Sequence, residues 1–192
     1  MTTKKMIRMA VLAAFGVILM YFIAFPFPIF PGFLTYDPGD IPGIIATFAM
    51  GPWAGVLVQF LKCLMGYLVG ASRAAFIGMM ANFVAGGTMV LVAGLIYRYR
   101  KTKRMAILSL GVSTAIASLV MAIADYYVFF PLWGVSLAEA KPLLLSAVIP
   151  FNMLKFGISS VVTFLIYKKI KGFFEMEGLK GRREIAGTKD LW

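Results

Sequence analysis

Five of the charged or amide side chains that lie within segments otherwise apolar enough to cross a bilayer stand out: Lys62, Asn82, Asp125, Asn152 and Lys155. These side chains donate or accept hydrogen bonds. A lysine at the bilayer centre costs roughly 2.5–3.5 kcal/mol on insertion scales, so each lysine must face a partner, a cavity or a ligand. The five residues therefore predict a polar binding pocket within a membrane protein.

Asn152 and Lys155 are three positions apart, so they share one face of a helix. An amide and an ammonium group together suit a planar ligand that is rich in carbonyl groups. The structural alternative is that Lys155 forms an ion pair with Asp125 or Asp40 and binds no ligand. The residues alone leave both interpretations open.

The remaining polar residues also have structural alternatives. Lys62 could extend its ammonium group toward the interface or a loop carbonyl, and Asn82 could hydrogen-bond between helices. Asp37 and Asp40 flank a Pro-Gly pair, a turn sequence in which an aspartate accepts hydrogen bonds from backbone N–H groups. We expect Asp40 to cap the amino terminus of the helix that follows.

The composition is that of a membrane protein. Of the 192 residues, 61% are hydrophobic and 14% are charged, whereas soluble domains carry about 25% charged residues. We expect one membrane domain and no separate catalytic domain. The net charge of +11 does not predict nucleic-acid binding, because the basic residues cluster where apolar segments end, as in loops that face anionic lipid on the cytoplasmic side.

The residue inventory argues against an enzyme. The chain has one cysteine, Cys63, and no histidine, which excludes disulfides, thiolate metal sites, imidazole bases and Ser-His-Asp triads. It has no G-x-x-x-x-G-K-[ST] phosphate loop, so it does not hydrolyse ATP by that machinery, and the energy for any uphill transport comes from a partner or an ion gradient. We expect no cofactor and no metal.

An all-α integral membrane protein with six spans accounts for the hydropathy pattern. The first apolar run follows basic residues, as in a signal peptide, but lacks a small-residue cleavage pattern, so we expect a retained span. A proline-rich external loop, Pro26 to Asp40, comes after it. The expected spans are about 9–25, 41–50, 53–69, 74–97, 105–128 and 143–167.

The second and third spans are separated at Gly51-Pro52. One helix from Ile41 to Ser72 would measure about 48 Å, which is too long for a hydrocarbon core of about 30 Å. With six spans, the amino terminus, the basic loop from Arg98 to Arg104 and the polar tail 172–192 fall on one side, which the positive-inside rule predicts to be cytoplasmic. Asn82, Asp125 and Asn152 then lie in the outer halves of their helices and converge on an outward-facing pocket.

Small residues mark one face of the first span. Ala10 and Ala14 form a small-xxx-small pair that lets another helix approach closely, either within the protein or from a partner. Aromatic residues near the outer interface fit an aromatic belt, although one or two could stack on a ligand ring. These residues are Tyr36, Tyr126, Tyr127 and Trp133.

Several strings together resemble the substrate-binding S components of energy-coupling factor (ECF) vitamin transporters, specifically the riboflavin-binding type. They are FLTYDPGDIP (33–42), GPWAGVLVQFLK (51–62), ANFVAG (81–86), DYYVFFPLWG (125–134) and IPFNMLK (149–155). The resemblance implies a six-helix protein of the plasma membrane that captures riboflavin from outside as a transported ligand. It would dock on a transmembrane coupling (T) component driven by two ATPase subunits.

The resemblance also implies roles for individual residues. Docking maps to Ala10 and Ala14. Flavin contacts map to the loop residues Leu34, Thr35, Tyr36 and Asp37, and to Asn152 and Lys155. Asp125 stands where the family leads us to expect asparagine, so its hydrogen bond differs, since a carboxylate only accepts. With Lys62 and Asn82, these residues form the predicted substrate site.

The chemistry of the residues agrees with that implication. The isoalloxazine ring of riboflavin offers two carbonyls and an imide N–H, which Lys155 and Asn152 match, whereas a deep lysine would repel a cationic vitamin. A carboxylate vitamin such as biotin stays an alternative. Two other functional classes also stay open. One is a self-sufficient proton-coupled transporter that uses Asp125 and Lys155 as a relay, and the other is a membrane-embedded enzyme or scaffold.

Overall fold

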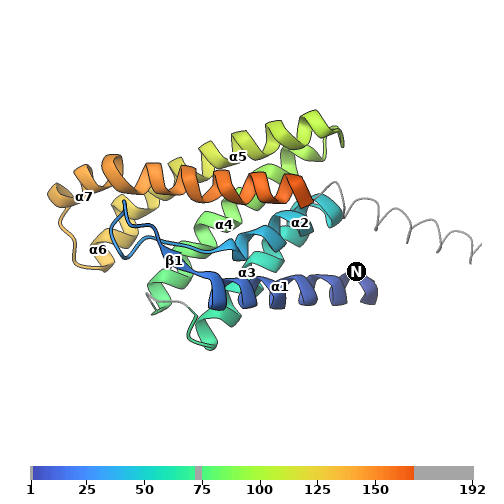
Figure 1. Cartoon of the computed structure of the whole chain (residues 1–192), viewed down its shortest axis with the longest axis horizontal. Helices are drawn as coiled ribbons and strands as arrows, with labels where there is room; N and C mark the ends of the chain where they lie inside the picture. The colour runs from blue at the N-terminus through green and yellow to red at the C-terminus, as the bar shows by residue number, and fades with distance from the viewer. Residues whose placement is uncertain (1, 72–74, 167–192) are drawn as a thin grey trace, which may run out of the picture.

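The structure is a computed structural model that describes residues 2–71 and 75–166. The expected tail 172–192 lies outside the described residues. Within them the protein is a bundle of helices with one short two-stranded sheet. Figure 1 shows the helices running along the long axis of the molecule.

Across the described residues, six α-helical segments follow one another. The first four are α1 (Thr3–Ile23), α2 (Ile41–Met50), α3 (Pro52–Leu68) and α4 (Ala75–Tyr97), and the fifth begins with α5 (Lys103–Ala124). Helix α5 continues through the π-helical turn η2 (Asp125–Phe129) into α6 (Phe130–Leu132). The sixth begins with α7 (Leu137–Leu143) and the π-helical turn η3 (Leu144–Val148), and it continues to Ile166, so we call Leu137–Ile166 the last helix.

Among the described residues, four helices are long and apolar enough to cross a membrane. They are Thr3–Ile23, Ala75–Tyr97, Lys103–Leu132 and Leu137–Ile166. Helix α3 is apolar but has 17 residues, and α2 has 10. Because 10 helical residues span about 15 Å, α2 cannot cross a hydrocarbon core by itself.

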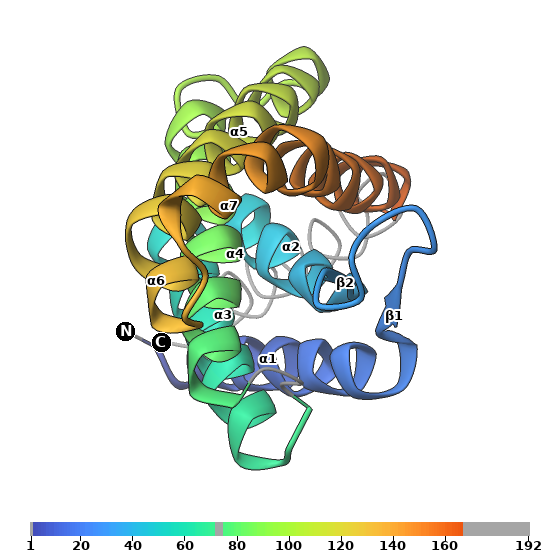
Figure 2. The ribbon, with the colours of Figure 1, turned by 90° about the vertical axis from the view of Figure 1, so that its left-hand side faces the viewer.

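Helix α2 lies in the middle of the bundle, with the other helices around it (Figure 2). Every residue from Ile41 to Phe48 is buried, which is typical of a helix that is apolar on all sides. The helix ends where Gly51 adopts a φ of 101°, a value that favours glycine, and Pro52 opens α3. Gly55 then lets α3 pass so close to α2 that an added Cβ would overlap the side chain of Thr47.

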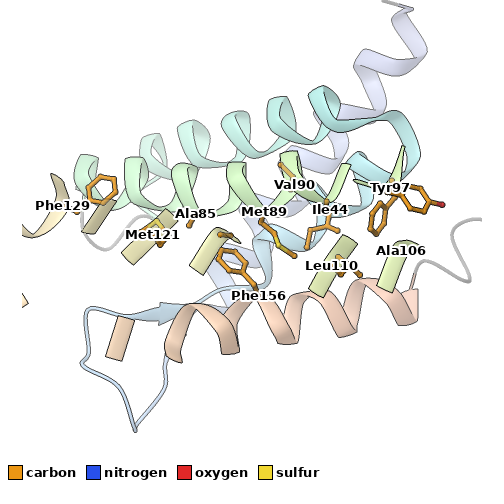
Figure 3. Close-up of a cluster of buried hydrophobic side chains, with 13 residues drawn as sticks. Ile44, Ala85, Met89, Val90, Tyr97, Ala106, Leu110, Met121, Phe129 and Phe156 are labelled. Carbon is orange, nitrogen blue, oxygen red and sulfur yellow. The ribbon is translucent and has the colours of Figure 1, made fainter. Parts of the chain in front are cut away.

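The largest apolar cluster joins α2, α4, α5 and the last helix (Figure 3). Ile44 of α2 contributes to it together with Met89 and Val90 of α4, Leu110 of α5 and Phe156 of the last helix. Each is at most 3% exposed. This cluster fixes the helices that carry most of the predicted polar residues.

The segment between α1 and α2 closes one end of the bundle. Strand β1 (Phe25–Pro26) pairs antiparallel with β2 (Thr35–Tyr36), and the short 3-10 helix η1 (Pro38–Asp40) leads into α2. Phe30 of this segment packs edge-on against Phe151 of the last helix, with ring centroids 5.5 Å apart. In Figure 1 this segment and α6 lie at the end of the bundle opposite the amino-terminal end of α1.

Candidate functional site

A cavity of about 300 Å³ opens among the α1–α2 segment, α4, η2 and the last helix. This volume is at the lower end of the range for small-molecule pockets. Seven of the nine residues that the sequence singles out for substrate binding line it: Leu34, Thr35, Asp37, Asn82, Asp125, Asn152 and Lys155. Residues from four separate parts of the chain thus surround one cavity.

Two lysines and two aspartates form a buried charge network beside this cavity. Lys62 Nζ lies 2.8 Å from Asp40 Oδ1 and 3.7 Å from Asp37 Oδ1. Lys155 Nζ lies 3.2 Å from Asp37 Oδ2 and 3.3 Å from Asp40 Oδ2. Each lysine therefore faces both carboxylates, and the four charges balance. This balance is what makes two ammonium groups tolerable inside the bundle.

Two amides complete the network. Asn82 Oδ1 accepts hydrogen bonds from Lys62 at 3.5 Å and Lys155 at 3.3 Å, and its Nδ2 donates to Asp37 at 3.4 Å. Gln59 Nε2 donates to Asp40 Oδ1 at 2.5 Å. Gln59 was not among the residues expected at the site. Its signal was an amide three positions before Lys62 on an apolar helix, which places both on one helix face.

Asp37, which stands before η1, holds the loop in shape. Its Oδ1 accepts a hydrogen bond from the Gly39 backbone N–H at 3.0 Å, as the turn sequence predicts. Burial by itself would raise the pKa of the Asp37 carboxyl, but the ammonium groups of Lys155 and Lys62 hold that pKa well below its usual range. Asp37 is therefore an anion that is bonded on both of its oxygens.

The expectation that Asp40 caps α2 is wrong. Asp40 precedes the helix, but its side chain makes no capping hydrogen bond. It is fully buried and turns toward Lys62 and Gln59. An ammonium group in the interior is a stronger partner for a buried carboxylate than the helix N–H groups, because it also compensates the charge.

Tyr36 and Lys62 are not among the residues that line the cavity. The Tyr36 ring packs against Phe25, with centroids 5.6 Å apart, in the two-stranded sheet. Lys62 is fully buried behind the wall, where its aspartate partners hold it. Lys62 thereby supports Asp37, which does line the cavity.

Asp125 and Asn152 retain hydrogen-bonding capacity toward the cavity. Asn152 Nδ2 donates to the Val148 carbonyl at 2.9 Å, so its Oδ1 is left as an acceptor. Asp125 is 5% exposed, and its carboxylate makes no hydrogen bond or ion pair with another described residue. Lys155 pairs with Asp37 and Asp40 and not with Asp125, so nothing in this geometry favours a relay between Lys155 and Asp125.

Aromatic side chains meet across the cavity. Phe33 of the α1–α2 segment and Trp133, which follows α6, both line it, and their ring centroids are 6.1 Å apart. Phe33 also contacts Phe130 at 6.4 Å. Phe33 is 47% exposed and Trp133 is 37% exposed. The pair therefore lies where the cavity meets the surface.

The site is built for binding. It offers carboxylate and amide acceptors, an ammonium donor and aromatic rings around a mainly apolar space, which is the usual composition of a small-molecule pocket. In the two described ranges, no cluster of His, Cys, Asp and Glu side chains could hold a metal ion.

A family model described as "ECF transporter, substrate-specific component" matches residues 4–167. The chain belongs to this family. The S component is therefore a subunit of a membrane transporter and not an enzyme, in agreement with the resemblance found in its sequence strings.

Named relatives cover nearly the whole S component. It is 35% identical over 178 residues to riboflavin transporter RibU of Staphylococcus aureus (strain TCH60), with 90% of this chain and 93% of the relative covered. It is 30% identical over 185 residues to riboflavin transporter FmnP of Bacillus subtilis (strain 168), with 92% and 97% covered.

Solved structures share its fold. A structure reported as the S component of a bacterial ECF transporter is 35% identical, with a TM-score of 0.78, and the match covers 88% of this chain and 96% of that one. ThiT from Listeria monocytogenes matches with a TM-score of 0.65 over 88% and 96% of the two chains, at 15% identity. The second likeness shows the fold alone.

Proposed function

We propose that this S component binds riboflavin from outside the cell and delivers it inward with a T component and two ATPase subunits. The relatives named as riboflavin transporters, at 35% and 30% identity over most of the chain, carry this proposal. The cavity supports it, because its lining combines polar groups of both kinds with aromatic rings. Riboflavin is the transported ligand in this proposal, and no cofactor is needed.

The polar groups of the cavity match the edge of an isoalloxazine ring. An ammonium group has three N–H donors, and Lys155 donates to Asp37 and Asn82. Its Nζ also lies 3.3 Å from Asp40 Oδ2, so a ligand carbonyl competes with Asp40 for the third donor. Asn152 Oδ1 and Asp125 supply acceptors for the imide N–H or for ribityl hydroxyls.

The proposed substrate contacts are therefore Leu34, Thr35, Asp37, Asn82, Asp125, Asn152 and Lys155. Tyr36 and Lys62 do not line the cavity, and in this proposal they position residues that do. Tyr36 holds the loop beside β1, and Lys62 holds both aspartates of the network.

We propose that all six helical segments form a single membrane domain with both termini cytoplasmic. The amino-terminal end of α1 and the basic α4–α5 connection lie at the same end of the bundle (Figure 1). The positive-inside rule assigns that end to the cytoplasm. The loop that lines the cavity lies at the opposite end, where substrate would arrive from outside.

We propose that α1 docks on the T component. Ala10 is exposed and Ala14 is half-exposed, whereas Ala13 and Gly16 are buried against the bundle. The outward face thus presents small residues among exposed apolar ones such as Val11 and Ile18. Such a face allows a partner helix to approach closely within the membrane.

Titration of the purified, membrane-inserted protein with riboflavin tests the proposal, with quenching of flavin fluorescence as the readout. We expect saturable binding that Asn152→Ala weakens by about 1–3 kcal/mol, because it removes a buried acceptor. Ser146→Ala is the control on the same helix, since Ser146 is exposed and bonds only within its helix. Absence of flavin binding by the folded protein at any concentration would refute the function.

A further inference from the structure

The backbones of α1 and η1 touch at two glycines. A Cβ placed on Gly16 would lie 3.0 Å from the Gly39 carbonyl oxygen, and one placed on Gly39 would lie 2.7 Å from the Gly16 carbonyl oxygen. Both residues are buried. Because neither carries a side chain, helix and loop are in direct backbone contact.

The same contact includes the charge network. The Gly16 Cβ position is also 3.0 Å from Lys62 Cγ, so the aliphatic stem of Lys62 lies against α1. Gly39 stands between the two aspartates of the network, and its N–H donates to Asp37 Oδ1 at 3.0 Å. A shift of Gly39 therefore displaces the partners of both lysines.

The network leads directly to the cavity wall. Asp37 Oδ2 lies 3.2 Å from Lys155 Nζ, and both residues line the cavity. The path from α1 to the ligand space is thus Gly16, Gly39, Asp37 and Lys155, with direct contact at each step.

The opposite face of α1 carries the proposed docking residues. Gly16 follows Ala14 by two positions, which is about 200° around a helix, and Ala14 and Ala10 face outward. Any tilt or rotation of α1 that a partner imposes on its outer face moves Gly16 on its inner face, because a helix moves as one rigid element.

We propose that Gly16 and Gly39 are positioning residues that couple the docking face of α1 to the substrate cavity. The inference rests on the proposed function. Docking of the T component on Ala10 and Ala14 shifts η1, and this loosens the hold of Asp37 and Lys155 on riboflavin. By thermodynamic linkage, bound riboflavin changes the affinity for the partner by the same factor.

Gly16→Ala tests the coupling in the complete protein. The methyl group must displace the Gly39 carbonyl or the Lys62 stem, so we expect riboflavin to dissociate roughly tenfold faster. Alanine stabilises a helix more than glycine does, so the unfolding midpoint of the unliganded protein should fall little, and faster dissociation should not reflect general destabilisation. Gly111→Ala is the matched control, because a Cβ there meets nothing within 4 Å, and it should leave dissociation unchanged.

A second measurement needs no flavin and keeps the two proposals distinguishable. Hydrogen exchange at the backbone N–H groups of residues 35–37 and 39–41 should accelerate in Gly16→Ala and not in Gly111→Ala. Unchanged exchange together with unchanged flavin dissociation would overturn the coupling. Failure of the unmodified protein to bind riboflavin would instead refute the proposed function, while the exchange result would still decide whether Gly16 positions η1.

The third measurement uses the partner. Riboflavin affinity is compared with and without the T component and its ATPases in the same membranes. We expect the partner to weaken flavin binding in the unmodified protein and in Gly111→Ala, and to do so at least threefold less in Gly16→Ala. An equal effect of the partner in all three proteins would contradict the role of this contact in coupling.

Discussion

Lys155 Nζ lies 3.2 Å from Asp37 Oδ2, although 118 positions separate the two residues in the chain. This ion pair ties the last helix to the loop between α1 and α2, and both of its members line the cavity. It therefore belongs to the framework of the bundle and to the substrate site together.

Removing one member of this pair should destabilise the protein. We expect Lys155→Met and Asp37→Asn each to lower the free energy of unfolding by about 3–5 kcal/mol, because each leaves one charge of the buried four-charge network uncompensated. Thermal unfolding in detergent measures the effect. The double substitution should recover part of the loss, and strictly additive losses would show that the two charges do not act as a pair.

Substitution of Asp125 should separate binding from stability. The Asp125 carboxylate has no partner among the described residues, so Asp125→Ala breaks no ion pair of the fold. We expect riboflavin binding to weaken by about 1–3 kcal/mol through the loss of a buried acceptor, with little change in the unfolding midpoint. A large loss of stability with unchanged affinity would assign Asp125 to the framework instead.

The contact between Phe33 and Trp133 should control the exchange of ligand with the cavity. We expect Trp133→Ala to raise the rates of riboflavin association and dissociation, because the rings meet where the cavity reaches the surface. Stopped-flow fluorescence measures both rates. Trp53→Ala is the control, since Trp53 is 71% exposed on α3 and does not line the cavity.

Bulky residues on the outer face of α1 should block uptake without affecting binding. We expect Ala10→Trp and Ala14→Trp to abolish partner-dependent riboflavin uptake, because a large side chain prevents close approach of a second helix. Flavin affinity of the isolated protein should stay the same. Leu119→Trp, at a 59% exposed position of α5, serves as the control; uptake that survives both alanine substitutions would place the docking face elsewhere.

Local patterns in the sequence predicted much of the fold. A Gly-Pro pair cannot continue a helix, and the chain does end one helix at Met50 and begin another at Pro52. Long apolar runs predicted an all-helical membrane protein, and polar residues within them pointed to the wall of the cavity. These inferences succeed because hydropathy, proline and glycine act over a few residues.

The pairing of the polar groups depended on the tertiary structure. The sequence could not show that Lys62 faces Asp40 behind the wall, that Gln59 joins them, or that Asp40 leaves its helix uncapped. Nor could it show that Gly16 and Gly39 touch. Such contacts join residues that are far apart in the chain, so they depend on how the helices pack. The sequence alone determined that these polar groups lie in apolar segments and therefore need partners.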